Sequence, residues 1–352
     1  VSANRVPWST TLSGVGGFKV TELGLPPAIE RVANHPIFSN VTVQDFTQLG
    51  PNGGDLYLMG DTTHSMIANL SLVAGRHSLK LGLDARLNYV NFGQLDVPTG
   101  AYNFTRAFTQ GPDPRSPSST AGVGYASFLL GTGTGRLTHQ ILPANANHYT
   151  GFYVQDDFKV TATLTLNLGF RWDFESGTTE RFDRLTAIDP YVRNPLSDKT
   201  GMDLRGGTLF GGSTLGRRAI RETDMRQLNP RVGLAYQLNP STAIRAGYGI
   251  FFGVPPYGAS RHYVGAAFQS ETPWIGAMPD GITPKDSLSN PFPDGFNLYT
   301  GTASGLLAQV GYAIWDGWPA VLLPPYNQQW NFTIQREFGP NVVWEIAYAG
   351  NK

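Results

Sequence analysis

Few residues in this sequence have the type and spacing that catalysis or metal binding would need. Asp156 and Asp157 could act as a general acid and base, but adjacent side chains of a strand point to opposite faces. Residues 131–135 (Gly-Thr-Gly-Thr-Gly) resemble a phosphate-binding loop without its Lys-Ser/Thr ending, which favours a flexible loop. The chain has no cysteine, and no metal-ligand spacing joins its six histidines, which are His35, His64, His77, His139, His148 and His262. The sequence therefore predicts no catalytic, cofactor or metal site and no enzyme activity.

Strands are the elements that would position any functional side chain, because apolar and polar residues alternate. In residues 78–89 the odd positions are apolar, whereas the even positions include Lys80, Asp84 and Arg86. Residues 164–175 repeat this pattern, and a period of two places the two sets on opposite faces of a strand. Six further segments alternate less cleanly: 64–73, 148–158, 228–238, 244–252, 330–338 and 342–348. Pro230 is the only one of the 25 prolines inside these eight segments, which supports the assignment.

Short turns alternate with long connections along the chain. The predicted strands pair through turns at residues 74–77, 159–163, 239–243 and 339–341, and the pairs are separated by residues 90–147, 176–227 and 253–327. Two more strands are conceivable at 41–48 and 136–142, and the apolar segment 121–130 is either a short helix or a strand. This alternation is typical of membrane barrels, with short periplasmic turns and long extracellular loops.

The composition agrees with a strand protein and excludes several other classes. Of 352 residues 42 are Gly, 12% are aromatic and only 15% are charged, a mixture that disfavours helical bundles. The formal net charge is zero, which removes the electrostatic basis for nucleic-acid binding. The lack of cysteine excludes a disulfide scaffold, and the apolar runs are too short for a transmembrane helix.

Aromatic residues favour a membrane barrel over a soluble sandwich. They gather near the strand ends, whereas aliphatic residues lie between, as the two interfaces of a bilayer select. Segments of about 10 to 12 residues also suit tilted membrane strands better than soluble strands. Asp156 and Arg336 fall on the lipid-facing parity, near the turn end where a charge is least costly. The predicted aromatic girdle comprises Phe158, Trp172, Tyr236, Phe252, Trp330, Phe338 and Trp344.

The opposite parity predicts a polar lumen. Its charged residues are expected to hydrate the lumen and to pair with a plug, more than to contact a ligand directly. They are Lys80, Asp84, Arg86, Asp157, Arg171, Asp173, Glu175, Arg231, Arg245, Glu337 and Glu345. Ligand contact is expected instead at aromatic residues of the long loops, namely Trp274, Trp315, Trp318 and Tyr326.

Several of these segments resemble TonB-dependent outer-membrane receptors. The hairpin Tyr149-Thr-Gly-Phe-Tyr-Val-Gln-Asp-Asp-Phe-Lys159 and Leu164-Thr-Leu-Asn-Leu-Gly-Phe-Arg171 is similar to a barrel hairpin of that family. Similarity to its Oar-like branch lies in Asn229-Pro-Arg-Val-Gly-Leu-Ala-Tyr236, Ile244-Arg-Ala-Gly-Tyr-Gly-Ile-Phe-Phe252, Pro325-Tyr-Asn-Gln-Gln-Trp-Asn-Phe332 and Ala347-Tyr-Ala-Gly-Asn351. The resemblance covers the chain from about residue 64 to its end.

The resemblance implies an all-β fold, a transmembrane antiparallel up-and-down β-barrel of 22 strands in the bacterial outer membrane. It also implies a plug inside the barrel and uptake of a bulky ligand driven by the TonB complex. Residues 1–352 are expected to supply about 8–10 strands, with no recognisable plug domain, TonB-contacting segment or signal peptide. The chain is thus expected to be an internal piece of a longer receptor, with outer-membrane lipid, the plug, the TonB complex and the ligand as partners.

Two other functions remain open at this point. A passive porin-like channel would need neither plug nor TonB. A secreted all-β protein that binds or hydrolyses carbohydrate would use the aromatic loop residues as subsites.

Overall fold

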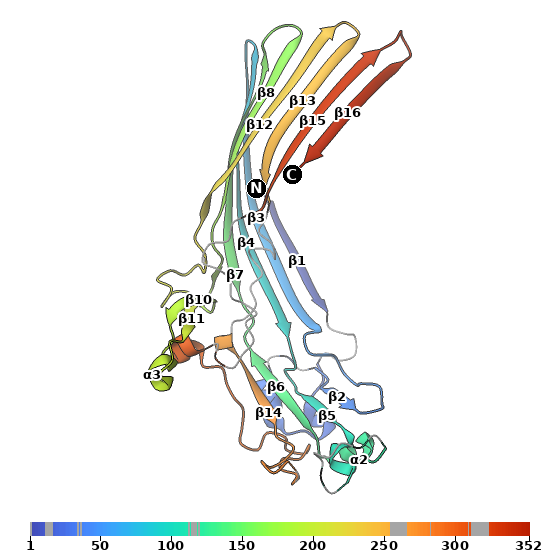
Figure 1. The fold of residues 1–352 in the computed structure, drawn as a ribbon, viewed down its shortest axis with the longest axis vertical. Helices are drawn as coiled ribbons and strands as arrows, with labels where there is room; N and C mark the ends of the chain where they lie inside the picture. Colours follow the sequence, from blue (N-terminus) through green and yellow to red (C-terminus); the bar gives the residue numbers. More distant parts are fainter. Residues whose placement is uncertain are drawn as a thin grey trace.

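The dominant feature of the computed structural model is one long antiparallel sheet (Figure 1). The structure describes residues 2–10, 17–33, 35, 37–111, 113, 118, 120–253, 266–281, 283–308, 310 and 324–352. Ten strands form the sheet, nine of them in the order β1-β3-β4-β7-β8-β12-β13-β15-β16, while the short β9 pairs with β7. Their bounds are β1 Ser2–Thr10, β3 Leu56–Ala74, β4 His77–Leu95, β7 Asn145–Lys159, β8 Leu164–Glu175, β9 Thr179–Glu180, β12 Asp224–Asn239, β13 Thr242–Phe252, β15 Tyr326–Glu337 and β16 Val343–Asn351.

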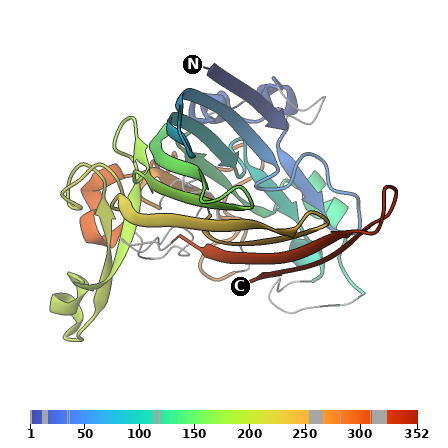
Figure 2. The ribbon, with the colours of Figure 1, turned by 90° about the horizontal axis from the view of Figure 1, so that it is seen from above.

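All eight strands predicted from alternation are confirmed, and they pair in sequence order as an up-and-down sheet. The predicted turns are also confirmed, and they lie together at the upper end of the sheet in Figure 1. The tightest turn joins Ala74 to His77, and Gly75 there has φ +61°, a left-handed conformation that glycine adopts without strain. Seen from above, the sheet is curved, with β1 and β16 at its two edges (Figure 2).

Strand β1 was not predicted, because the segment has no clear alternation and contains Pro7. Proline lacks the N–H that a central strand needs, so it is tolerated at a sheet edge. Strand β1 lies at such an edge and pairs with β3.

Strands β3 and β4 are much longer than predicted, with 19 residues each. Their additional residues lie at the loop end of the sheet. There Val90 and Phe92 of β4 are buried although they share the parity of Asp84 and Arg86. The face that carries charge near the turns therefore includes buried apolar residues near the loops.

The long connections contain a second sheet of four strands, in the order β14-β6-β5-β2. It comprises β2 Asn40–Val43, β5 Ala101–Phe104, β6 Thr134–Gln140 and β14 Gln269–Trp274, drawn from three segments far apart in the chain. The conceivable strands at 41–48 and 136–142 correspond to β2 and β6, so they lie in this sheet and not in the long one. We call the four strands and the helices packed on them the distal unit.

The distal unit has its own hydrophobic core. Tyr102, Phe104, Leu137 and Trp274 are buried there with Ile29 of α1 (Pro27–Val32). The apolar segment 121–130 is helical, as α2 (Gly124–Leu129). Short 3-10 helices complete the connections: η1 Val20–Leu23, η2 Arg106–Thr109, η3 Ala266–Phe268 and η4 Gly301–Leu307. None of the described helices is long and apolar enough to cross a membrane.

Two ion-pair clusters fasten the connections to each other and to the long sheet. Arg136 of β6 contacts Asp96, just after β4, at 2.8 Å and Glu271 of β14 at 3.1 Å. Asp96 raises the pKa of the Arg136 guanidinium by its hydrogen bond and its charge.

The second cluster surrounds the buried Glu180 of β9. Burial alone would raise the pKa of its carboxyl group, but hydrogen bonds from Arg184 and from backbone N–H groups hold the pKa below its usual value. Beyond it the hairpin of β10 (Thr186–Arg193) and β11 (Arg205–Phe210) carries α3 (Leu196–Thr200).

Candidate functional site on the inward face of the sheet

The pairing registers place all the predicted lumen residues on one face of the long sheet, which we call the inward face. In β4 these are even-numbered residues and in β7, β8, β12, β13, β15 and β16 odd-numbered ones. The set contains Lys80, Asp84, Arg86, Asp157, Arg171, Asp173, Glu175, Arg231, Arg245, Glu337 and Glu345. The other side is the outward face.

Around Asp84 and Asp173 the sheet buries charge while it exposes apolar side chains on its other face, the reverse of a soluble protein. On the inward face Asp84 and Asp173 are each 8% exposed. On the outward face Leu70 is 63% exposed, Phe152 45% and Ile346 53%. A soluble sheet buries its apolar face, whereas a membrane barrel turns that face to lipid and encloses its polar face.

A charge network lies at the middle of the inward face. Arg86 contacts the Asp84 carboxylate at 2.7 Å, and Arg171 contacts Asp173 at 2.7 Å and Asp84 at 3.5 Å. The Tyr149 hydroxyl donates to Asp173 at 2.6 Å and accepts from Arg171 at 2.6 Å. Both buried carboxylates are therefore neutralised within the network, and one face of strands β4, β7 and β8 is cross-linked.

Gly151 makes this network possible. The register places it directly between Asp84 of β4 and Asp173 of β8. A Cβ atom at Gly151 would collide with the Asp173 carboxylate and the Arg171 guanidinium. Only the absence of a side chain in β7 lets charges from β4 and β8 meet above it.

Asn229 extends the network to β12 and β13. Its Nδ2 donates to Asp173 Oδ2 at 3.0 Å, and its Oδ1 accepts from the backbone N–H of Phe252 at 2.9 Å. The sequence prediction covered only charged residues and so missed both Asn229 and Tyr149. Their parity within the predicted strands was the signal that could have identified them.

A second polar cluster surrounds Glu175, nearer the loops. Asn147 donates to its carboxylate, and the Arg221 guanidinium lies 3.6 Å away. Arg221 belongs to the connection between β11 and β12, and its side chain is 6% exposed. No periodic pattern could have identified it, because it lies outside any strand.

The other predicted lumen residues lie apart from this network, nearer the turns. Asp157 accepts a hydrogen bond from Asn167 at 2.6 Å, and Arg245 donates to Gln335 at 3.3 Å. Glu337 and Glu345 are exposed.

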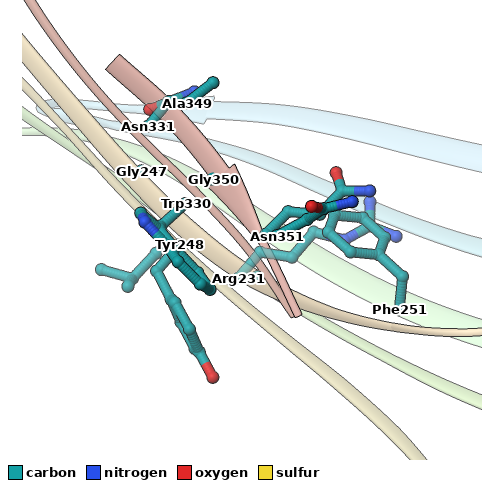
Figure 3. A pocket seen from close by; sticks show the side chains of 12 residues that line it. Arg231, Gly247, Tyr248, Phe251, Trp330, Asn331, Ala349, Gly350 and Asn351 are labelled. Carbon is teal, nitrogen blue, oxygen red and sulfur yellow. The ribbon is translucent and has the colours of Figure 1, made fainter. Parts of the chain in front are cut away.

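A groove of about 520 Å³ lies beside the network (Figure 3). Its lining includes Gly247 and Gly249 of the inward parity and Tyr248 and Trp330 of the outward parity. Arg231 and Phe251 also line it, with the guanidinium carbon 4.7 Å from the ring centre. Figure 3 shows Tyr248 directed away from this side of the strands. A guanidinium group, an aromatic ring and the side-chain amides of Gln329, Asn331 and Asn351 can together hold a polar ligand or a polypeptide segment.

Comparison with known families agrees with a sheet that exposes apolar residues on one face and buries charged residues on the other. The family described as outer membrane beta barrel domain matches residues 1–352. The chain belongs to this family. It is therefore an outer-membrane β-barrel protein, which excludes the secreted all-β alternative. No curated protein matches the chain.

The barrel is similar to several solved structures at low identity. The copper transporter OprC is 12% identical with a TM-score of 0.33, over 80% of this chain and 29% of that one. The siderophore receptor PiuA from Acinetobacter baumannii is 11% identical with a TM-score of 0.33, over 83% and 32%. The ferric citrate transporter FecA is 9% identical with a TM-score of 0.27, over 83% and 27%. The chain thus spans less than a third of the length of each of these proteins.

The predicted girdle residues all have outward parity. Six of them lie within strands, and Phe338 directly follows β15. At the loop end Trp172 donates its indole N–H to the Met225 carbonyl at 2.8 Å. The ring of Phe252 packs there against that of Tyr326, with 5.7 Å between ring centres. At the turn end Phe158 stacks on His77, with 4.3 Å between ring centres. The full set is Phe158, Trp172, Tyr236, Phe252, Trp330, Phe338 and Trp344.

The two charges on the lipid-facing parity have partners near the turns. His77 Nδ1 lies 2.7 Å from Asp156 Oδ2, so a neighbouring strand supplies a hydrogen bond to this carboxylate. The Arg336 guanidinium lies over the ring of Phe338 at 5.0 Å. Both contacts lower the cost of placing a charge beside lipid.

The predicted ligand-contact residues have different environments. Trp274 is 2% exposed in the core of the distal unit, where it presents no surface to a ligand. Tyr326 is exposed at the start of β15. Trp315 and Trp318 lie outside the described residues. Among those described, no group of three or more acidic, histidine or cysteine side chains could hold a metal ion.

Proposed function

We propose that this barrel is part of a non-enzymatic receptor for TonB-dependent uptake of a bulky ligand across the outer membrane. The observation that carries the proposal is the distal unit. Strands from the connections between β1 and β3, between β4 and β7 and between β13 and β15 form one sheet there with its own core, at the loop end of the barrel. A structure of this size outside the membrane suits recognition of a large ligand before it enters the lumen.

The long sheet supports the same function. Among the described pairings, β1 pairs with β3 alone and β16 with β15 alone, so the two edges are open. A membrane barrel has no open edge, so we infer that strands beyond those described close it. A barrel wider than these strands alone could enclose a plug, and the inward charges and the groove beside them are the surfaces a plug would contact.

The proposal can be tested with cysteine labelling, because the chain contains no cysteine. Lys80 lies on the inward face near the turns, in a recess with Tyr153 and Arg171, whereas Leu81 is its outward neighbour. The protein carrying Lys80→Cys is exposed in intact cells to a bulky polar maleimide, in strains with and without TonB. Leu81→Cys is the matched control.

If the protein is such a receptor, Lys80→Cys is labelled more slowly in cells without TonB than in cells with TonB, because the plug then stays in the lumen. Equally fast labelling in both strains would indicate a passive porin-like channel and refute TonB dependence. Labelling of Leu81→Cys as fast as Lys80→Cys would contradict the assignment of the two faces.

A further inference from the structure

Two shallow pockets lie one after the other along the strands on the outward face, from near the turns to the middle of β3 and β4. The larger one, about 510 Å³, is lined mainly by apolar residues of β3, β4, β7 and β8. The other, about 280 Å³, lies nearer the loops and includes His64 and His148. The larger pocket spans β3, β4, β7 and β8, and the smaller one continues along β3, β4 and β7. We call the two together the outward groove.

Successive rows of outward residues define the outward groove. The row nearest the turns, which we call the deepest row, contains Leu70, Leu81, Val154 and Phe170. The next row contains Ala68, Leu83, Phe152 and Trp172. Met66, Ala85 and Thr150 follow, and the last row is His64, Leu87 and His148. The small side chains of Ala68 and Ala85 lie between larger ones, which leaves the hollow.

The length of the outward groove matches one lipid leaflet. Alternate residues of a strand are roughly 7 Å apart, so four rows extend about 20 Å along the strands. With a tilt of about 45°, this corresponds to about 15 Å of depth, half of a hydrocarbon core of about 30 Å. A single acyl chain therefore fits between the deepest row and the histidines.

The chemistry changes from apolar to polar where the head group of such a lipid would lie. His64 and His148 flank Leu87 from the two neighbouring strands, roughly 10 Å apart at their backbones. Both are exposed, and each imidazole can donate a hydrogen bond to a phosphate oxygen. In the outward residues of these four described strands Asp156 is the one carboxylate, and it pairs with His77 at the turn end. No negative charge of these strands therefore opposes a phosphate at the histidines.

We propose that the outward groove binds a phosphate-bearing membrane lipid of the leaflet at the loop end. The acyl chain lies over Ala68 and Ala85, and the phosphate accepts hydrogen bonds from His64 and His148. This site is separate from the lumen. The lipid proposal depends on the outer-membrane location of the barrel and on the outward face, and not on TonB-dependent uptake.

The proposal can be tested by native mass spectrometry of the intact protein purified from outer membranes in detergent. Phosphatidylglycerol is titrated onto the protein, and diacylglycerol with the same acyl chains is the probe without phosphate. The variant His64→Gln/His148→Gln is expected to bind phosphatidylglycerol ~10-fold more weakly with unchanged binding of diacylglycerol, because hydrogen bonds to a charged group are lost. His77→Gln, on the same face at the opposite end, is the control and is expected to bind as the wild type does.

A second pair of variants tests the apolar part. Ala85→Phe fills the outward groove and is expected to abolish tight binding of both lipids, whereas Ala246→Phe adds the same ring to the outward face of β13 and is expected to leave binding intact. Unchanged phosphatidylglycerol binding in the double histidine variant would overturn the phosphate contact. Equal losses in the two phenylalanine variants would overturn the location of the acyl chain.

Discussion

Asp173 is the carboxylate on which the inward network depends most, so its removal should cost the barrel much of its stability. It accepts hydrogen bonds from Tyr149, Arg171 and Asn229 at 2.6, 2.7 and 3.0 Å, and its side chain is 12% exposed. Asp173→Ala removes all three and leaves the Arg171 guanidinium, itself largely buried, with the Tyr149 hydroxyl and with Asp84, 3.5 Å away, as its remaining carboxylate. Breaking a buried pair from one side costs about 3–5 kcal/mol, and we expect about 3 kcal/mol here because part of the network faces water.

The measurement is the free energy of unfolding in urea for the protein folded into lipid vesicles, followed by tryptophan fluorescence. The matched control is Asp203→Ala, which breaks an exposed Asp–Arg pair of the same sequence spacing with Arg205, 3.2 Å apart. Exposed pairs contribute about 0–1 kcal/mol, so the control should lose little. The double variant Asp173→Ala/Arg171→Met should be more stable than Asp173→Ala, because it removes the unpaired charge. A loss for Asp173→Ala no larger than for Asp203→Ala would refute the reasoning.

Three further predictions concern glycine, tryptophan and histidine positions. Gly151→Ala should destabilise the barrel by about 1–3 kcal/mol in the same urea assay, because its methyl group meets the charge network, whereas Gly60→Ala, with open space around it, should change little. Trp274→Ala should destabilise the distal unit by about 3–5 kcal/mol, seen as faster hydrogen exchange in β5 and β6 with β13 unchanged; equal acceleration in β13 would contradict an independent core. Burial lowers the pKa of His139 in β6, so the folded state favours its neutral form, and protection of β6 should be full above about pH 6.5 and fall as the pH drops below that value. His139→Gln should remove this part of the pH dependence, and an unchanged profile would contradict the assignment.

Sequence alone was sufficient for eight strands of the long sheet. Alternation with a period of two is a local property, and it identified eight strands, their turns and the two faces. It failed at β1, whose residues have no clear alternation and include Pro7. It also underestimated β3 and β4. In β4 the inward parity switches near the loops from charged residues to the buried Val90 and Phe92.

The candidate site was predicted only in part for a similar reason. Parity assigned Asp84, Arg171 and Asp173 to one face, but not which of them touch. That depends on Gly151, which opens the space above β7, and on Asn229, which reaches across from β12. The partners of a side chain in a sheet are set by register between strands, which no single strand contains.

The sequence by itself thus determined the class of fold, the course of the chain through the sheet and the side of the sheet that carries charge, because these follow from neighbouring residues. Only the tertiary structure decided that Trp274 is core and not ligand surface, and that three connections form one distal unit. It also decided that His64 and His148 flank one groove. These features join residues distant in the chain, and the packing and register that join them exist only once the sheet has formed.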